Sequence, residues 1–481
     1  MHKKSTIHTS VCQESCLILL QISQSEYTKC VKYYIANLSS VCYDVIKTAN
    51  DGEYDMDYLK RIADEQLRFK MEAFGAALII GPKGCGKTTT AKKQAKSYIE
   101  FQDEDERENY LLIASTHPSD LLKGLKPRLF DEWQDAPKIW GAIRKDVDDS
   151  GEVGQYILTG SSSAAVDTPH TGTLRISRIK MYPMSLYESK ESNGEVSLLR
   201  LFEHPDSFTT CKSDMSIDDI KFTICRGGWP ASLRGKSDKA KLAIAKDLLN
   251  QTCSADISKI DNVKRNATWA KTILKSYARN LCRLADAKTI LADVTATCDM
   301  SKQTYYDYIN GFEKLLIIDD IEAWCPAIRS KTSIRSSKKR NVVDPSIAAA
   351  ALGISPEYFS NDYKTLGFLF ESLCIRDLKV YSASAGGSVS YYHDRLGLEA
   401  DAVLHLEDGR YALIEFKLGQ SEIDDGARHL CEIERLITMH NKTEKQVQIR
   451  MPDLKLIITG TQYGYRREDG VVVIPIGCLK D

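Results

Sequence analysis

The residues with the clearest chemistry in this sequence lie between Gly81 and Thr90, Gly-Pro-Lys-Gly-Cys-Gly-Lys-Thr-Thr-Thr. A glycine, four residues, Gly-Lys and a Ser or Thr form the phosphate-loop pattern, whose backbone N–H groups surround a polyphosphate. We expect Lys87 to reach the β- and γ-phosphates of ATP and the Thr88 hydroxyl to ligate Mg²⁺. The predicted nucleotide-binding residues of the loop are Gly81, Pro82, Lys83, Gly84, Cys85, Gly86, Lys87, Thr88 and Thr89.

The segments that flank the loop agree with this interpretation. Residues 76–80 are apolar and predict a buried strand, and residues 87–101 predict a helix whose N-terminus faces the anion. A Gly-rich turn without a ligand is the alternative, because chance produces the pattern in roughly a few per cent of chains this long. The predicted strand and helix favour the nucleotide site.

Two acids, Asp131 and Glu132, end the short apolar segment 127–132. At the tip of a strand beside the loop, Asp131 would hold Mg²⁺ through water, and Glu132 would be the catalytic residue that orients the attacking water. An Asp-Glu pair by itself is more often a solvated strand end. Its position after the phosphate loop, in an alternation of strands and helices, favours the catalytic role.

Further polar residues lie on the later strands of this region. Thr159 and Ser161 end a predicted strand, where a polar residue senses the γ-phosphate in additional-strand P-loop ATPases. A hydroxyl that caps the following turn explains them equally well. Arg175 and Arg178 lie on a predicted fifth strand, and either could supply positive charge to the γ-phosphate, although most arginines on strands are solvated. The second strand is expected at residues 110–114.

The composition restricts the class of protein. The chain has 481 residues, which is enough for about three domains, and its net charge is -1, so any nucleic-acid site must be local. The 14 cysteines are scattered without zinc-ligand spacing, and unpaired thiols in a large chain indicate a reducing compartment. Because no apolar segment approaches the length of a membrane span, we predict a cytoplasmic protein with no membrane partner.

A second candidate site lies on two predicted strands, residues 398–406 and 410–418. A three-residue loop with a left-handed Gly409 would place Asp401 directly opposite Glu415. Lys417 then lies on the same face, because side chains alternate along a strand. In PD-(D/E)XK nucleases, two such acids bind Mg²⁺ and the lysine is catalytic, since it orients or deprotonates the attacking water.

This second site has alternatives. Glu371, on a preceding helix, could complete the metal shell. A two-residue turn would instead shift the register and put Asp401 and Glu415 on opposite faces of the sheet. Glu and Lys at alternate strand positions also form ordinary cross-strand ion pairs.

Three predicted helices precede this region, at residues 269–284, 288–296 and 301–314, and a predicted strand follows at 315–324. This is the order of a winged helix, which binds DNA in some proteins and packs against protein in others. Residues 329–340 hold six basic residues and no acid, and could bind phosphates, although a solvated basic loop is the default interpretation.

With these residues in place, the chain resembles the prokaryotic AAA-like ATP-binding proteins that carry a C-terminal domain of unknown function. The strings that carry the resemblance are Asp131-Glu132-Trp133-Gln134, Ile157-Leu158-Thr159-Gly160-Ser161, His170-Thr171-Gly172, Met184-Ser185-Leu186, Gly227-Gly228-Trp229-Pro230, Val343-Asp344-Pro345-Ser346, Gly367-Phe368-Leu369-Phe370-Glu371 and Glu415-Phe416-Lys417-Leu418-Gly419. In one departure, this chain has Leu174-Arg175 where the family usually has Gly-Arg.

The resemblance implies an α/β protein with three parts. These are a P-loop ATPase with a parallel sheet, a winged-helix-like middle and a C-terminal fold like that of PD-(D/E)XK nucleases or restriction endonucleases. We place them at residues 55–235, 236–335 and 336–481, after an N-terminal extension at 1–54.

Two functions follow as hypotheses. The first is a Mg²⁺-dependent ATPase that drives a DNA-handling and nuclease module. The second is an ATP-controlled switch that binds DNA or protein through a catalytically inactive nuclease fold. ATP is the expected ligand, and DNA and a second copy of the chain are candidate partners.

Overall fold

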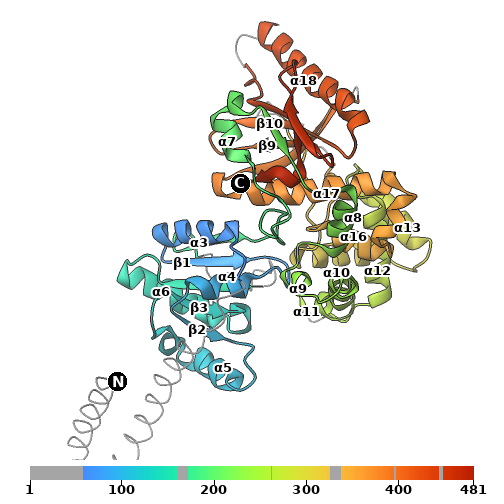
Figure 1. Cartoon of the computed structure of the whole chain (residues 1–481). Helices are drawn as coiled ribbons and strands as arrows, with labels where there is room; N and C mark the ends of the chain where they lie inside the picture. Colours follow the sequence, from blue (N-terminus) through green and yellow to red (C-terminus); the bar gives the residue numbers. More distant parts are fainter. Residues whose placement is uncertain (1–57, 161–171, 262, 326–336, 395–396, 444–447) are drawn as a thin grey trace, which may run out of the picture. The chain divides into compact units, whose positions relative to one another are not determined.

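The computed structural model describes residues 58–160, 172–261, 263–325, 337–394, 397–443 and 448–481. The extension at residues 1–54, Ser161 and most of the basic segment 329–340 lie outside the described residues. The chain divides into the units Met1–Tyr58 and Leu59–Asp481, and the description that follows concerns the second (Figure 1). Among the described residues, no helix has the length and apolar character needed to cross a bilayer.

A five-stranded parallel sheet holds the phosphate loop, in the order β2-β3-β4-β1-β5. Its strands are β1 Ala76–Ile80, β2 Ser97–Glu100, β3 Arg128–Asp131, β4 Tyr156–Gly160 and β5 Ile176–Lys180. Its helices are α3 Ile62–Ala73, α4 Lys87–Gln94, α5 Arg107–Thr116 and α6 Lys138–Ser150, with 3₁₀ turns at Pro118–Leu122 and Trp133–Asp135. Helices on both faces bury the central strands, of which β1 is entirely apolar, whereas β3 begins with Arg128 and ends with Asp131.

The prediction for the second strand was wrong. Residues 110–114 lie in α5, and the second strand is β2, which the prediction had included in the helix after the phosphate loop. That helix ends at Gln94. In β2, which pairs in parallel with β3, Ser97 and Ile99 are buried and alternate with partly exposed residues. Residues 97–100 form a strand because they pair with β3. This long-range contact cannot be predicted from the neighbouring residues alone.

The middle of the chain is helical. Its elements are α8 Ile217–Arg226, α9 Pro230–Leu233, α10 Asp238–Gln251, a π-helical turn Thr252–Asp256, α11 Ile257–Lys259, α12 Ala267–Arg279, α13 Ala287–Thr295, α14 Lys302–Lys314, α16 Pro345–Leu352 and a 3₁₀ turn Pro356–Ser360. Ser301 caps α14, since its side chain accepts the N–H of Thr304 at 3.1 Å.

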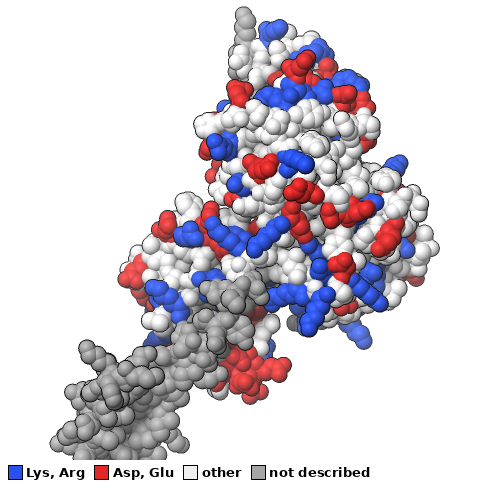
Figure 2. All heavy atoms as spheres, viewed as in Figure 1, with Lys and Arg blue, Asp and Glu red and all other residues white. Residues whose placement is uncertain are grey.

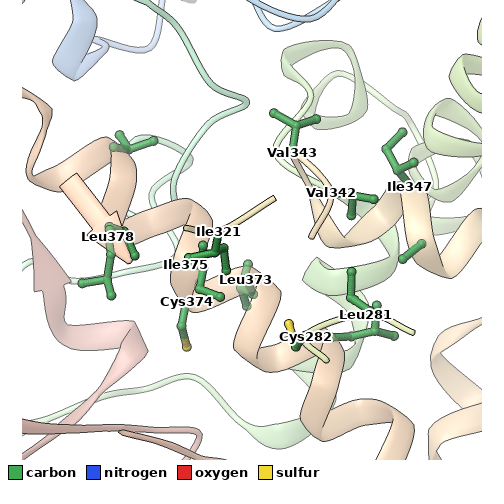
Figure 3. Close-up of a cluster of buried hydrophobic side chains, with 14 of the residues drawn as sticks. Leu281, Cys282, Ile321, Val342, Val343, Ile347, Leu373, Cys374, Ile375 and Leu378 are labelled. Atoms are coloured by element: carbon green, nitrogen blue, oxygen red, sulfur yellow. The ribbon is translucent and has the colours of Figure 1, made fainter. Parts of the chain in front are cut away.

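Isolated bridges replace the strand expected after α14. Ile318 pairs with Val342 and Ile321 with Lys339, both antiparallel, and Ala323 pairs with Tyr391 in parallel. We call residues 318–323 and 337–342 the paired segments. Ile321 of the first segment and Val342 of the second belong to a buried cluster that includes Leu373, Cys374 and Ile375 of α17 (Figure 3).

The C-terminal part contains a seven-stranded mixed sheet, in the order β7-β12-β13-β11-β10-β9-β8. Its strands are β7 Thr210–Lys212, β8 Ser388–His393, β9 Glu399–His405, β10 Tyr411–Lys417, β11 Leu454–Thr459, β12 Tyr463–Arg466 and β13 Val472–Pro475. The helices are α7 Leu198–Glu203, α17 Tyr363–Tyr381 and α18 Ile423–Thr443, with 3₁₀ turns at Pro205–Ser207, Ala383–Ala385, Gln420–Glu422 and Ile476–Cys478. A separate pair joins β6 Val196–Ser197 to β14 Leu479–Lys480.

The hairpin of β9 and β10 has the predicted register. Tyr411 pairs with His405 and Ile414 with Ala402. Gly409 has a φ of 87°, so the three-residue loop with a left-handed glycine is confirmed. The turn therefore places Asp401 and Glu415 at the next opposed positions of the two strands.

Candidate functional site

The phosphate loop connects β1 to α4 and is shaped by its glycines. Gly86 immediately precedes α4 with a φ of 105°, a conformation that any side chain would strain. At Gly81 a Cβ atom would lie 2.4 Å from the carbonyl oxygen of Met181 on the chain leaving β5. The loop can therefore pass close to the neighbouring strand only with glycine at that position.

Lys87 and Thr88 begin α4, directly after this turn. The buried Lys87 ammonium donates to the carbonyl oxygens of Gly81 at 3.0 Å and Pro82 at 3.1 Å. The Thr88 hydroxyl donates to Oδ1 of Asp131 at 2.8 Å. The loop lysine, the threonine and the first acid of β3 thus meet at the carboxyl edge of the sheet.

Thr159 joins the two acids at the tip of β3. Its hydroxyl donates to Oδ1 of Asp131 and accepts the backbone N–H of Glu132 at 3.2 Å. Strand β4 lies between β1 and β3, which is why the sheet order brings Thr159 to this point. Burial raises the pKa of Asp131, and its hydrogen bonds from Thr159 and Thr88 oppose that shift.

Glu132 follows β3 in a left-handed conformation, with a φ of 52°. Its Oε2 accepts a hydrogen bond from Nε2 of Gln134. Positive φ in a residue with a side chain costs free energy and is common at functional sites. The turn directs the chain away from the strand immediately after the acid pair.

Sequence reasoning missed Arg61, which precedes α3. Its guanidinium donates to the carbonyl oxygens of Cys85 and Tyr182, both at 2.8 Å, and pairs with Glu188 at 3.1 Å. Both charged side chains are buried. Arg61 thus connects the phosphate loop with the segment after β5, and no local pattern around it signals this contact.

The two arginines proposed as sources of positive charge occupy different settings. Arg175 pairs with Asp148 at 2.7 Å, and Arg178 on β5 is exposed. The preceding Leu174 has a φ of 67°. The turn before Arg175 is therefore left-handed at a leucine.

The second candidate site lies on β9, β10 and α17. Nζ of Lys417 lies 2.6 Å from Oε2 of Glu415 and 3.9 Å from Oδ2 of Asp401. Oδ2 of Asp401 also accepts the backbone N–H of Phe416 at 2.9 Å. A cavity of about 680 Å³ is lined in part by Glu371, Asp401 and Lys417. The structure therefore brings the predicted residues of this site together.

Burial strongly affects the charges of this site. Burial and the charge of Asp401 raise the pKa of Glu415 to about 8, against the opposing effect of Lys417. The same two causes raise the pKa of Glu371 to about 7, against the opposing effect of Lys339. Oε1 of Glu415 lies 3.6 Å from Nδ1 of His429. Neither of these two atoms has a hydrogen-bond partner in the described part of the chain.

Lys339 is the residue of this site that sequence reasoning missed. Its ammonium lies 2.7 Å from Oε1 of Glu371 and 3.9 Å from Oδ1 of Asp401, and it donates to the carbonyl oxygen of Asp401 at 3.3 Å. Its neighbours also have partners, since Lys338 pairs with Glu322 at 2.9 Å and Arg340 with Asp320 at 2.6 Å. The described end of the basic segment is therefore paired with acids.

No three His, Cys, Asp or Glu side chains form a metal-binding group in the part of the chain that the structure describes. Acidic and basic side chains are interspersed on the surface shown in Figure 2. That distribution agrees with the net charge of -1.

Comparisons with known proteins divide the chain into three matched regions. Residues 73–190 match an AAA domain, residues 217–358 a domain of unknown function (DUF8612) and residues 366–479 a domain of unknown function (DUF4143). No curated protein matches the chain. Among solved structures, the Walker-type ATPase PABY2304 of Pyrococcus abyssi is 13% identical, with a TM-score of 0.38, over 62% of this chain and 97% of that one. The chain thus contains an AAA-type ATPase domain, which supports ATP binding and hydrolysis in general, and a C-terminal DUF4143 domain.

Proposed function

We propose that this protein is a Mg²⁺-dependent ATPase whose site is built from the phosphate loop and the tips of β3 and β4. The observation that carries the proposal is the 2.8 Å hydrogen bond between Thr88 and Asp131 beside the Lys87 ammonium. A hydroxyl and a carboxylate are oxygen ligands of the kind that Mg²⁺ prefers, so these residues fit the ion. When bound, Mg²⁺ would neutralise charge on the β- and γ-phosphates.

The residues of the loop have defined tasks in this proposal. The backbone N–H groups of the loop bind the phosphates, except at Pro82, which has no N–H. Lys87 exchanges its hydrogen bonds to the loop carbonyls for hydrogen bonds to phosphate oxygens. Thr159 orients Asp131 and Glu132 together. Glu132 orients the attacking water, and Gln134 holds its carboxylate in place.

The test is steady-state ATP turnover by the full chain and its variants. We expect K87A to weaken nucleotide binding, and E132Q to bind ATP with little change while its turnover falls on the order of 10²-fold or more. Nucleotide binding is measured separately with a fluorescent ATP analogue. Unchanged turnover in both variants contradicts the proposal.

We further propose that the ATPase controls a nucleic-acid-handling module made of the helical middle and the C-terminal sheet. The boundaries of these parts differ from the predicted ones, because α8, α9 and α16 belong to the helical middle and β7 to the C-terminal sheet. The helices α12, α13 and α14, followed by antiparallel bridges, support a winged-helix-like middle. The element order α17, β8, β9, β10, α18, β11 and the facing Asp401 and Glu415 support a PD-(D/E)XK-like fold. DNA and RNA incubated with Mg²⁺ or Mn²⁺, with and without ATP, test for cleavage, and D401A is the control.

A second candidate function is the ATP-controlled binding switch without cleavage. The observation that favours it is the ammonium of Lys339 beside Glu371 and Asp401, where a nuclease would hold its metal ion. Nucleotide-dependent DNA binding without cleavage by the wild-type chain would support the switch. Metal-dependent cleavage that D401A abolishes would exclude it.

A further inference from the structure

Five charged side chains from four separate segments converge at the carboxyl end of β10. Three are acids, Glu371, Asp401 and Glu415, and two are lysines, Lys339 and Lys417. Each acid has an ammonium nitrogen within 4 Å, at 2.7 Å for Glu371, 3.9 Å for Asp401 and 2.6 Å for Glu415. We call these five side chains the acidic cluster.

The fold holds Lys339 in this cluster firmly. Its backbone exchanges two hydrogen bonds with Ile321, both of 2.9 Å. Ile321 and the nearby Val342 and Val343 pack in the same buried cluster as Leu373 and Cys374 of α17 (Figure 3). Lys339 itself is only 6% exposed. The paired segments therefore position the Lys339 ammonium beside Glu371 of α17.

The charge count distinguishes this cluster from the predicted metal site. Counted with all three acids ionised, which is the most negative state of the cluster, the acids and Lys417 alone carry a net charge of about −2, which one divalent cation would neutralise. The second ammonium brings the net charge to about −1. Together the two lysines already supply as much positive charge as one Mg²⁺ ion. A metal ion bound to Asp401 would also lie close to two ammonium groups and would be repelled by both.

The contacts of Lys339 agree with this count. Its ammonium lies 2.7 Å from Oε1 of Glu371 and 3.9 Å from Oδ1 of Asp401. With Lys339 in place, the residues of the cluster do not fit a divalent cation.

We propose that Lys339 is the resident cation of the acidic cluster, and that the cluster binds a divalent metal ion only when the Lys339 ammonium is displaced or removed. The paired segments then determine whether this site can hold metal. The proposal concerns the second candidate site and is independent of ATP hydrolysis at the first.

The experiment is a Mn²⁺ titration of the full chain, followed by electron paramagnetic resonance of free Mn²⁺. All variants carry D131N, which removes the carboxylate proposed to hold metal at the ATPase site. We expect K339M to gain one bound Mn²⁺ with a Kd at least 10-fold lower than that of the D131N parent. The added substitution D401N is expected to remove this gain.

The matched control is K338M. Lys338 is the adjacent residue of the same segment, but its ammonium pairs with Glu322 and its side chain is half exposed. Its removal is expected to leave Mn²⁺ binding at the parent's level. Thermal unfolding in EDTA and in Mn²⁺ gives a second readout, in which Mn²⁺ should raise the Tm of K339M by several degrees and leave that of K338M unchanged.

Two results would overturn the proposal. One is a D131N parent that binds Mn²⁺ as tightly as K339M and loses it with D401N, because the cluster would then accept metal beside Lys339. The other is a folded K339M that binds no additional Mn²⁺. If K339M does not fold, K339Q, which keeps an N–H donor toward Glu371, takes its place. Since ATP hydrolysis is not measured, neither result bears on the proposed ATPase.

Discussion

The hydroxyl of Thr88, at the start of α4, donates a hydrogen bond of 2.8 Å to Oδ1 of Asp131, at the end of β3. The two residues come from different strand–helix connections and meet because β4 alone separates their strands in the sheet. A threonine hydroxyl and an aspartate at this distance can share one hydrated Mg²⁺ ion. The pair therefore leads directly to a test of the ATPase site.

Replacing Thr88 by valine keeps the shape of the side chain but removes its oxygen. We expect the kcat for ATP to fall on the order of 10²-fold, because the proposed metal loses a ligand and Asp131 loses a donor. T88S, which keeps the hydroxyl, should retain most of the activity. Both variants are checked by steady-state ATP turnover across a Mg²⁺ titration. An equal loss of kcat in T88V and T88S would show that the loss does not come from the missing hydroxyl.

Arg61 should be a positioning residue for the phosphate loop. R61M leaves Glu188 buried without its cationic partner and leaves the carbonyl of Cys85 without its donor. We expect the free energy of unfolding to fall by about 3 kcal/mol and the affinity for ATP to weaken.

The control for R61M is the adjacent Lys60, whose pair with Glu65 is largely exposed. K60M should change little, because exposed ion pairs contribute little to stability. Urea unfolding and nucleotide binding are measured for both variants. Equal stability of R61M and K60M would show that the buried pair does not hold the loop.

Asp319 predicts a specific dependence of stability on pH. Burial alone would raise its pKa, but the ammonium groups of Lys379 and Lys180 outweigh burial and lower it to about 2. A lowered pKa contributes stability that is present above the unfolded value of 3.8 and is lost as the pH falls toward 2. The wild type should therefore lose about 1 kcal/mol more than D319N between pH 6 and pH 3.

This dependence is checked by urea unfolding of both proteins at several pH values. D319N should be the less stable protein at pH 6, and the difference should shrink as the solution is acidified. A difference that stays constant down to pH 3 would mean that Asp319 has an ordinary pKa in the folded protein.

Leu174 should be a site of stored backbone strain. It has a φ of 67° and its side chain is 80% exposed, so L174G removes an unfavourable conformation without removing packing. We expect the free energy of unfolding to rise by about 0.5 kcal/mol, since part of the gain is offset by the greater entropy of glycine in the unfolded chain.

Leu125 provides the matched comparison for Leu174. It is also exposed, at 63%, and is not among the described residues with positive φ. L125G should therefore destabilise the protein, while L174G stabilises it. Thermal or urea unfolding measures both, and a loss of stability in L174G would contradict the strain argument.

The sequence by itself determined the features that neighbouring residues decide. Gly84 and Gly86 set the turn of the phosphate loop, Ser301 and Asp344 cap their helices, and Gly409 sets the hairpin register. In each case the controlling contact spans only a few residues along the chain. Turn stereochemistry and helix capping can therefore be predicted from the local sequence, before any tertiary contact is known.

Only the tertiary structure decided the features that distant segments create. Strand β2 exists because it pairs with β3, so the local pattern alone led to the wrong strand. Arg61 reaches Tyr182 across 121 positions, and Lys339 reaches Asp401 across 62. The basic segment around Lys339 was predicted to be solvated, because its composition does not reveal the path of the backbone. Burial between two carboxylates, which makes Lys339 a counter-ion, is a property of the packed sheet and helix.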